Sequence, residues 1–272
     1  MMDVPLTAWL LIENTADHHG DTEVVSSIHD GSIVRHTYAE IVARTHRLMH
    51  ALDRMGLDDG DRVATLAWNG HRHLECYFAV PCTGRVLHTL NLRLSADDLG
   101  YIIAHAGDRV VIADADLLPL LEKCDPERLR SLERIVVMGD TVPETSLRNT
   151  VAYEDLIADM PDRHDKVDID ERATLGLCYT SGTTGRPKGV AYTHRSTFLH
   201  SLAASSAAAM SLGPQDCVLP VVPMFHANAW GIPHAATGVG AKLVLCGRHL
   251  DGPSLVDLIF DEDVTVAGGV PT

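Results

Sequence analysis

The residues from Tyr179 to Val190, Tyr-Thr-Ser-Gly-Thr-Thr-Gly-Arg-Pro-Lys-Gly-Val, combine residue types whose spacing points to chemistry. Glycines permit backbone turns that other residues resist and let a ligand approach closely. Successive backbone N–H groups in such turns converge on an anion, and a lysine ammonium group suits phosphate oxygens. The segment therefore predicts a phosphate-binding loop, made by Thr180, Ser181, Gly182, Thr183, Thr184, Gly185 and Lys188.

This loop differs from the P-loop of kinases and GTPases, which has the pattern Gly-x4-Gly-Lys-Ser/Thr. Lys188 stands three residues after Gly185 and is followed by Gly189, so the spacing argues against those enzymes. The alternative is a structural turn between two strands, since turns are rich in Ser, Thr and Gly. The full ordered string favours phosphate binding, because a plain turn needs neither its hydroxyl groups nor its Pro-Lys-Gly.

The string resembles the signature of the AMP-forming acyl-CoA synthetases, which are adenylate-forming enzymes. Further segments agree with that family in the same order, namely Asn91–Ser95, Val222–Pro233, Gly240–Val244 and Gly269–Thr272. The second of these is similar to medium- and long-chain fatty-acyl-CoA ligases and favours an aliphatic acid. The resemblance extends over essentially the whole chain.

The resemblance implies a two-step reaction. A carboxylate attacks the α-phosphate of ATP in the presence of Mg²⁺, giving acyl-AMP and pyrophosphate, and the thiol of coenzyme A then displaces AMP. By its position in the family, the loop would hold the β- and γ-phosphates, Thr180 would contact Mg²⁺, and Lys188 would be a catalytic residue. Fixed N–H dipoles and a lysine can stabilise the charge on departing pyrophosphate.

His226 falls at the family's carboxylate position, and we expect it to orient the acyl carboxylate or the adenylate as a second catalytic residue. Because the chain has 16 histidines, a structural histidine is the competing interpretation. Ala227 and Trp230 are the other expected acyl-site residues, although a tryptophan fits a plain core position equally well. A further group lacks metal-ligand spacing and is interpreted as a solvated helix face: His71, His73, Glu75 and Cys76.

Complete members of the family continue into a small C-terminal domain, for whose segments this chain has no counterpart. We therefore expect a truncated N-terminal part of a fatty-acyl-CoA ligase that forms little acyl-CoA by itself. An aryl-CoA ligase, a peptide-synthetase adenylation domain and a luciferase-like oxygenase stay open as relatives. An alternative of another class is a non-catalytic remnant that acts by nucleotide binding or association.

The elements that must position these residues alternate between strand-like apolar runs and helical patterns. This alternation predicts an α/β fold of mostly parallel sheets layered with helices. The clearest helix spans residues 37–55, where Thr37 and Glu40 form a capping box. The phosphate loop is expected to join strands at 175–180 and 188–193 at the edge of a sheet.

The polar, charge-rich stretch 148–171 is interpreted as a surface connection and gives the best internal boundary. Residues 1–170 are expected to form an N-terminal α/β lobe. Residues 171–272 are expected to begin a second α/β lobe that carries the phosphate loop, with the C-terminal domain absent.

Composition limits the classes of function. The 272 residues carry 22 Lys and Arg against 37 Asp and Glu, a net charge of −15, which argues against a nucleic-acid surface and docking on anionic lipid. No apolar stretch reaches the roughly 18–20 residues of a membrane span. Six scattered cysteines suggest reduced thiols in the cytoplasm.

The expected partners are a small carboxylic acid, ATP and coenzyme A, and a homodimer is left open.

Overall fold

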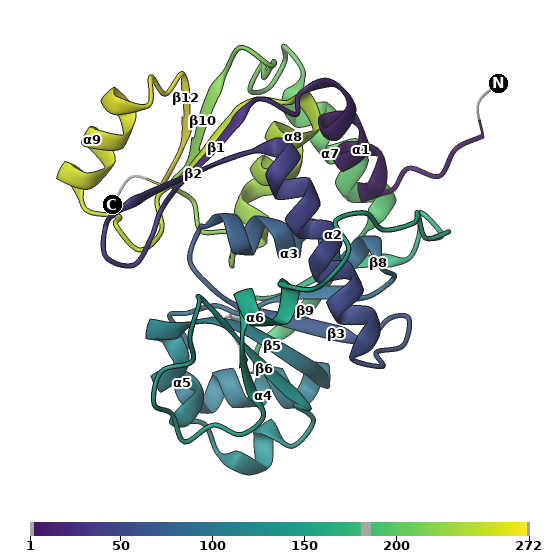
Figure 1. Cartoon of the computed structure of the whole chain (residues 1–272), viewed down its shortest axis with the longest axis vertical. Coiled ribbons are helices and arrows are strands. Elements are labelled where there is room, and N and C mark those ends of the chain that lie inside the picture. Colours follow the sequence, from purple (N-terminus) through teal and green to yellow (C-terminus); the bar gives the residue numbers. More distant parts are fainter. Residues whose placement is uncertain (1–2, 181–185, 271–272) are drawn as a thin grey trace.

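The computed structural model describes residues 3–180 and 186–270. Two β-sheets lie in this part of the chain, with helices packed between them and against their outer faces (Figure 1). This arrangement confirms the predicted α/β class.

The larger sheet of the described residues has seven strands, and only its last pair is antiparallel. In spatial order the strands are β7 (Thr150–Ala152), β6 (Arg134–Met138), β5 (Asp108–Asp114), β3 (Arg62–Leu66), β4 (Val86–Thr89), β8 (Thr174–Thr180) and β9 (Lys188–Thr193). The expected strands on either side of the phosphate loop are therefore present, and they form one edge of the sheet.

The smaller sheet has five strands among the described residues, and only β2 is antiparallel to its neighbour. In spatial order they are β12 (Val266–Gly268), β10 (Cys217–Pro220), β11 (Lys242–Leu245), β1 (Glu23–Ser27) and β2 (Ile33–Thr37). Both sheets thus take strands from either side of residue 170, and neither sheet corresponds to one expected lobe. The division of the chain into lobes at that residue stays a prediction.

The helices of the described chain are α1 (Ala8–His18), α2 (Tyr38–Arg54), α3 (His71–Cys82), α4 (Ala96–Ala106), α5 (Leu118–Glu122), α6 (Tyr153–Ile157), α7 (His194–Ser205), α8 (Ile232–Val239) and α9 (Gly252–Asp261). The largest buried cluster joins α1, α2, α3 and α8 to both sheets. A second cluster packs α4 and α5 on the other face of the seven-stranded sheet. A third joins α9 to the five-stranded sheet. None of these helices combines the length and apolarity needed to cross a membrane.

The predicted capping box of α2 is confirmed. Thr37 Oγ1 accepts a hydrogen bond from the backbone N–H of Glu40 at 3.3 Å, and the Glu40 carboxylate accepts one from the N–H of Thr37 at 2.8 Å. These two bonds satisfy donors that the first turn of a helix leaves free. All six cysteines are free thiols and buried, as expected.

The interpretation of residues 148–171 as a surface connection was wrong for their first half. Residues 150–152 form β7 and residues 153–157 form α6, whose Tyr153 and Ile157 are buried. Two short elements with three buried residues, Ala152, Tyr153 and Ile157, leave too weak a hydrophobic pattern to stand out among charged neighbours.

Candidate functional site

The loop predicted to bind phosphate connects β8 to β9, and its two ends are fixed by strand pairing. Thr180 and Lys188 are directly opposite partners in the antiparallel ladder, and both are exposed. Opposite residues of an antiparallel pair project their side chains from the same face of the sheet. The hydroxyl group and the ammonium group therefore lie on one face, at the point where the strands open into the loop. Ser181, Gly182, Thr183, Thr184 and Gly185 lie outside the described residues.

The glycine after Lys188 lies in a closely packed place on β9. A Cβ atom on Gly189 would lie 3.1 Å from Leu177 Cδ1 and 3.3 Å from the ring of Tyr179. Both distances are tighter than ordinary van der Waals contact, so a side chain here would require Leu177 and Tyr179 to shift by a few tenths of an ångström. Gly189 thus allows β9 to lie close to these side chains of β8.

Helix α4 contacts the residues at both ends of the loop. His105 Nδ1 lies 2.6 Å from the hydroxyl oxygen of Tyr179, the last residue before Thr180. Burial is the main cause that raises the pKa of Tyr179 to about 12, so this hydroxyl stays neutral. Near the other end of the loop, the Arg186 guanidinium lies 4.7 Å from the ring centroid of Tyr101, a cation–π contact. One rigid helix therefore positions the entry and the exit of the loop.

The segment that carries His226 is tied to β8. The Cys178 thiol donates a hydrogen bond of 3.2 Å to Asn228 Oδ1, and both side chains are buried. Ala227 to Trp230 have φ values between 45° and 56°, a left-handed conformation that few non-glycine residues adopt. The chain changes direction at this turn, where Asn228 contacts Cys178 near the end of β8. Cys178 is two residues before Thr180.

Residues 220–224, which lead to His226, are held by hydrogen bonds to Asn69 and Tyr77, two residues that sequence analysis missed. Asn69 Nδ2 donates to the carbonyl oxygens of Pro220 and Val222 at 2.8 and 3.0 Å, and its Oδ1 accepts from the N–H of Met224 at 2.8 Å. The hydroxyl of Tyr77 donates to the Met224 carbonyl. The position of Asn69, three residues after the end of β3, was the available signal.

The predicted acyl-site residues are accessible to different degrees. His226 is exposed, Ala227 is half-buried, and Trp230 keeps 47% of its surface exposed. His226 and Trp230 are thus not buried among the described residues, and their roles at an acyl site stay predictions. The link between this segment and β8 is the contact of Asn228, next to Ala227, with Cys178.

The interpretation of His71, His73, Glu75 and Cys76 as a solvated helix face was wrong, because all four are buried in α3. The helix is enclosed between the two sheets, and two of these side chains have buried polar partners. Nε2 of His73 lies 3.0 Å from Thr65 Oγ1, and Glu75 accepts a bond of 2.7 Å from Arg44 Nε. Nδ1 of His71 is buried without a hydrogen-bond partner among the described residues.

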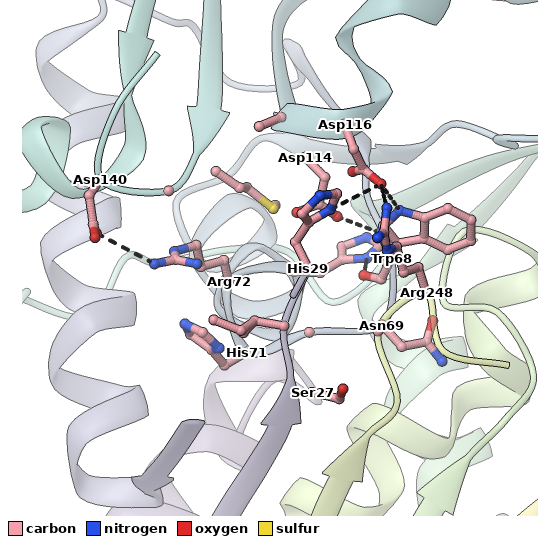
Figure 2. A pocket seen from close by; sticks show the side chains of 17 residues that line it. Ser27, His29, Trp68, Asn69, His71, Arg72, Asp114, Asp116, Asp140 and Arg248 are labelled. Carbon is pink, nitrogen blue, oxygen red and sulfur yellow. Dashed lines mark hydrogen bonds and ion pairs between the residues drawn. The ribbon is translucent and has the colours of Figure 1, made fainter. Parts of the chain in front are cut away.

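A cavity of about 240 Å³ opens near the ends of β3, β5 and β6 (Figure 2). These strands run parallel to β4 and β8, so the cavity lies at the carboxyl ends of the strands, the same end of the sheet at which β8 leads into the loop. Open α/β sheets bind ligands at the carboxyl ends of their strands. Asp114 accepts a hydrogen bond of 2.7 Å from the N–H of Trp68, and burial raises its pKa to about 7. Arg72 faces Asp140 at 3.9 Å, and Arg248 faces Asp116 at 3.5 Å.

The loop has the charge that nucleotide phosphates require. No carboxylate of the described residues lies within ion-pair distance of Lys188, so its ammonium group is available to an anion. The Thr180 hydroxyl is a hard oxygen donor of the kind that Mg²⁺ accepts. Lys188 therefore fits a nucleotide phosphate, and Thr180 fits Mg²⁺.

The chain is similar to known proteins in sequence and in structure. The chain matches the family described as "AMP-binding enzyme" over residues 12–272. It is 51% identical over its full length to a long-chain-fatty-acid–CoA ligase of Thermus thermophilus, covering 49% of that protein. It is 46% identical to a medium-chain-fatty-acid–CoA ligase of Ectopseudomonas oleovorans, covering 50% of it. The N-terminal domain of FACL13 from Mycobacterium tuberculosis is similar in structure, with a TM-score of 0.82, 26% identity, and coverage of 97% of this chain and 62% of that one. The chain spans about half the length of the curated relatives it matches.

Proposed function

The chain belongs to the AMP-binding enzyme family, and from that premise we propose that it takes part in the ATP-dependent activation of a fatty acid. The carboxylate oxygen forms a bond to the α-phosphorus of ATP, the bond to the pyrophosphate oxygen breaks, and pyrophosphate leaves. The sulfur of coenzyme A then forms a thioester with the acyl carbon, and AMP leaves. The thiol proton goes to solvent.

The single observation that carries this proposal is the pairing of Thr180 with Lys188 at the mouth of the loop. Lys188 would contact the β- and γ-phosphates, whose charge grows as pyrophosphate departs. Thr180 would contact the Mg²⁺ that accompanies them. Residues 181–185 would complete the phosphate site.

On the acyl side, His226 would hold the carboxylate or the adenylate by a hydrogen bond. Ala227 and the exposed ring of Trp230 would lie along the acyl chain. The names of the two relatives, a long-chain and a medium-chain ligase, favour an aliphatic acid. We place the protein in the cytoplasm, with coenzyme A as co-substrate and a homodimer as its candidate assembly.

The proposal can be tested with two proteins, the 272-residue chain and a hybrid that joins it to the remaining half of the Thermus thermophilus relative. Each is supplied with ATP, Mg²⁺, coenzyme A and fatty acids of increasing length, and pyrophosphate and acyl-CoA are measured. We expect turnover by the hybrid, with a preference for aliphatic over aromatic acids. Nucleotide binding without turnover by either protein would favour the non-catalytic alternative, and a preference for aromatic acids would favour an aryl-CoA ligase.

A further inference from the structure

Two histidines and an aspartate meet at the C-terminal end of α2, outside the site described above. His50 and Asp53 lie about one helical turn apart on α2, and His164 comes from the connection after α6. One potential ligand atom from each of the three side chains lies within 4.8 Å of the other two. The shortest of these approaches is 2.8 Å, between His164 Nε2 and Asp53 Oδ2.

We propose that His50, Asp53 and His164 bind a divalent transition-metal ion, and that zinc is the ion their chemistry favours. Two imidazole nitrogens and one carboxylate oxygen are donors that Zn²⁺ accepts together, with water in the fourth position. Mg²⁺ and Ca²⁺ prefer oxygen ligands alone, so this donor set discriminates against them. The side chain of Asp53 is 43% exposed, which leaves access for the ion and its water.

Both imidazole rings are oriented by backbone carbonyl groups. His164 Nδ1 lies 2.7 Å from the carbonyl oxygen of Asp165, and His50 Nε2 lies 2.7 Å from that of Arg163. Each contact uses one ring nitrogen and leaves the other for an ion. Metal-binding histidines are held in this way, because the second contact fixes the tautomer and the ring orientation.

The carboxylate of Asp53 is also held in place, by an ion pair with Arg85. Arg85 Nη1 donates to Asp53 Oδ1 at 2.5 Å, while Oδ2 faces His164. One carboxylate oxygen is therefore taken by the guanidinium group, and the other is directed to the histidine. Arg85 is itself buried, so the ion pair fixes the direction of Asp53.

In the described structure His164 Nε2 and Asp53 Oδ2 contact each other directly at 2.8 Å. A zinc ion would take the place of this contact and hold both atoms as ligands. Bonds of about 2.0–2.2 Å in a tetrahedron separate ligand atoms by roughly 3.3–3.6 Å. This value lies between the 2.8 Å from His164 to Asp53 and the 4.8 Å that bounds all three separations. Binding would link the residues around His164 to the end of α2.

The test uses the tag-free 272-residue chain, with Zn²⁺ measured by calorimetry and Co²⁺ by visible absorption. We expect one ion per chain, a higher unfolding temperature with Zn²⁺, and no binding of Mg²⁺ at this site. His164→Ala and His50→Gln should each weaken binding at least about 10-fold. His50→Gln keeps a donor for the Arg163 carbonyl, which protects the fold. The matched control is His18→Ala, which removes an exposed histidine without a hydrogen bond to the described residues and should leave binding unchanged.

Trp9 supplies an internal probe. Its ring centroid lies 6.5 Å from that of His164, so bound Co²⁺ should quench its fluorescence, and Trp9→Phe should abolish this quenching without changing the affinity. Folded His164→Ala and His50→Gln chains that bind zinc as tightly as the original would overturn the proposal. Equal weakening by His18→Ala, or absence of a saturable site, would also overturn it and leave His164 and Asp53 as an ion pair.

Discussion

Thr180 and Lys188 are directly paired across β8 and β9, although seven residues separate them in the chain. Paired residues in an antiparallel ladder have Cα atoms about 4.5–5.5 Å apart. The phosphate loop therefore begins and ends at one point of the sheet, and its hydroxyl and ammonium groups share one face. The hydrogen bond between His105 and Tyr179, next to Thr180, leads to the first prediction.

Tyr179→Phe should lower the free energy of unfolding by about 0.5–1.5 kcal/mol, because it removes one hydrogen bond to His105. The matched control is Tyr192→Phe on β9, whose hydroxyl has no hydrogen-bond partner among the described residues and whose loss should change stability by less than about 0.5 kcal/mol. Urea unfolding of the two variants measures the difference. Equal effects would mean that His105 does not hold the loop entry.

Asn69→Ala should destabilise the chain by roughly 3 kcal/mol or more. It leaves two backbone carbonyl groups and one N–H of residues 220–224 without the partner they have in the structure. Asn14→Ala is the control, since Asn14 makes one exposed hydrogen bond to the Gly238 carbonyl. A cost for Asn69→Ala no larger than that for Asn14→Ala, measured by urea unfolding, would show that Asn69 does not anchor the segment before His226.

Asp114→Asn should stabilise the protein at pH 8 and have a much smaller effect near pH 4. Burial raises the pKa of Asp114 from 3.8 to about 7, so the folded state holds a proton that the unfolded state has released between these values. The contribution of this group to the free energy of unfolding therefore falls as the pH rises from 4 to 7.

An asparagine oxygen can still accept the N–H of Trp68, and it avoids the cost of burying a charge. The expected gain at pH 8 is on the order of 1 to 4 kcal/mol. Thermal unfolding of both proteins across this pH range measures it. A gain independent of pH would show that Asp114 titrates normally in the folded protein.

Much of the fold was predictable because its signals are local. The capping box of Thr37 and Glu40, the strands beside the phosphate loop and the parallel character of the sheets follow from periodicity and from cap chemistry. The burial of His73 and Glu75 was not predictable, since their partners Thr65 and Arg44 are brought to them only by the packing of α3 between the sheets.

The residues of the candidate site were proposed from the sequence, and the contacts that support them were not. The order of residues 179–190 and its resemblance to a known signature pointed to the loop, and its binding of phosphate stays a prediction. The contact of Asn228 with Cys178 and the anchoring of Met224 by Asn69 join residues 50 and 155 positions apart. Such contacts depend on tertiary structure. The cluster of His50, Asp53 and His164 escaped sequence analysis for the same reason.

The central claim is that Lys188 acts on the departing pyrophosphate, and the most direct test is Lys188→Ala in the hybrid with the Thermus thermophilus half. Pyrophosphate release in a single turnover is compared with the conversion of supplied acyl-AMP to acyl-CoA. Loss of a contact that strengthens as charge develops should slow pyrophosphate release roughly 30- to 1000-fold, or about 2–4 kcal/mol, and leave the thiol step nearly unchanged. Equal slowing of both steps, or no slowing of either, would contradict this role and return the loop between β8 and β9 to a structural turn.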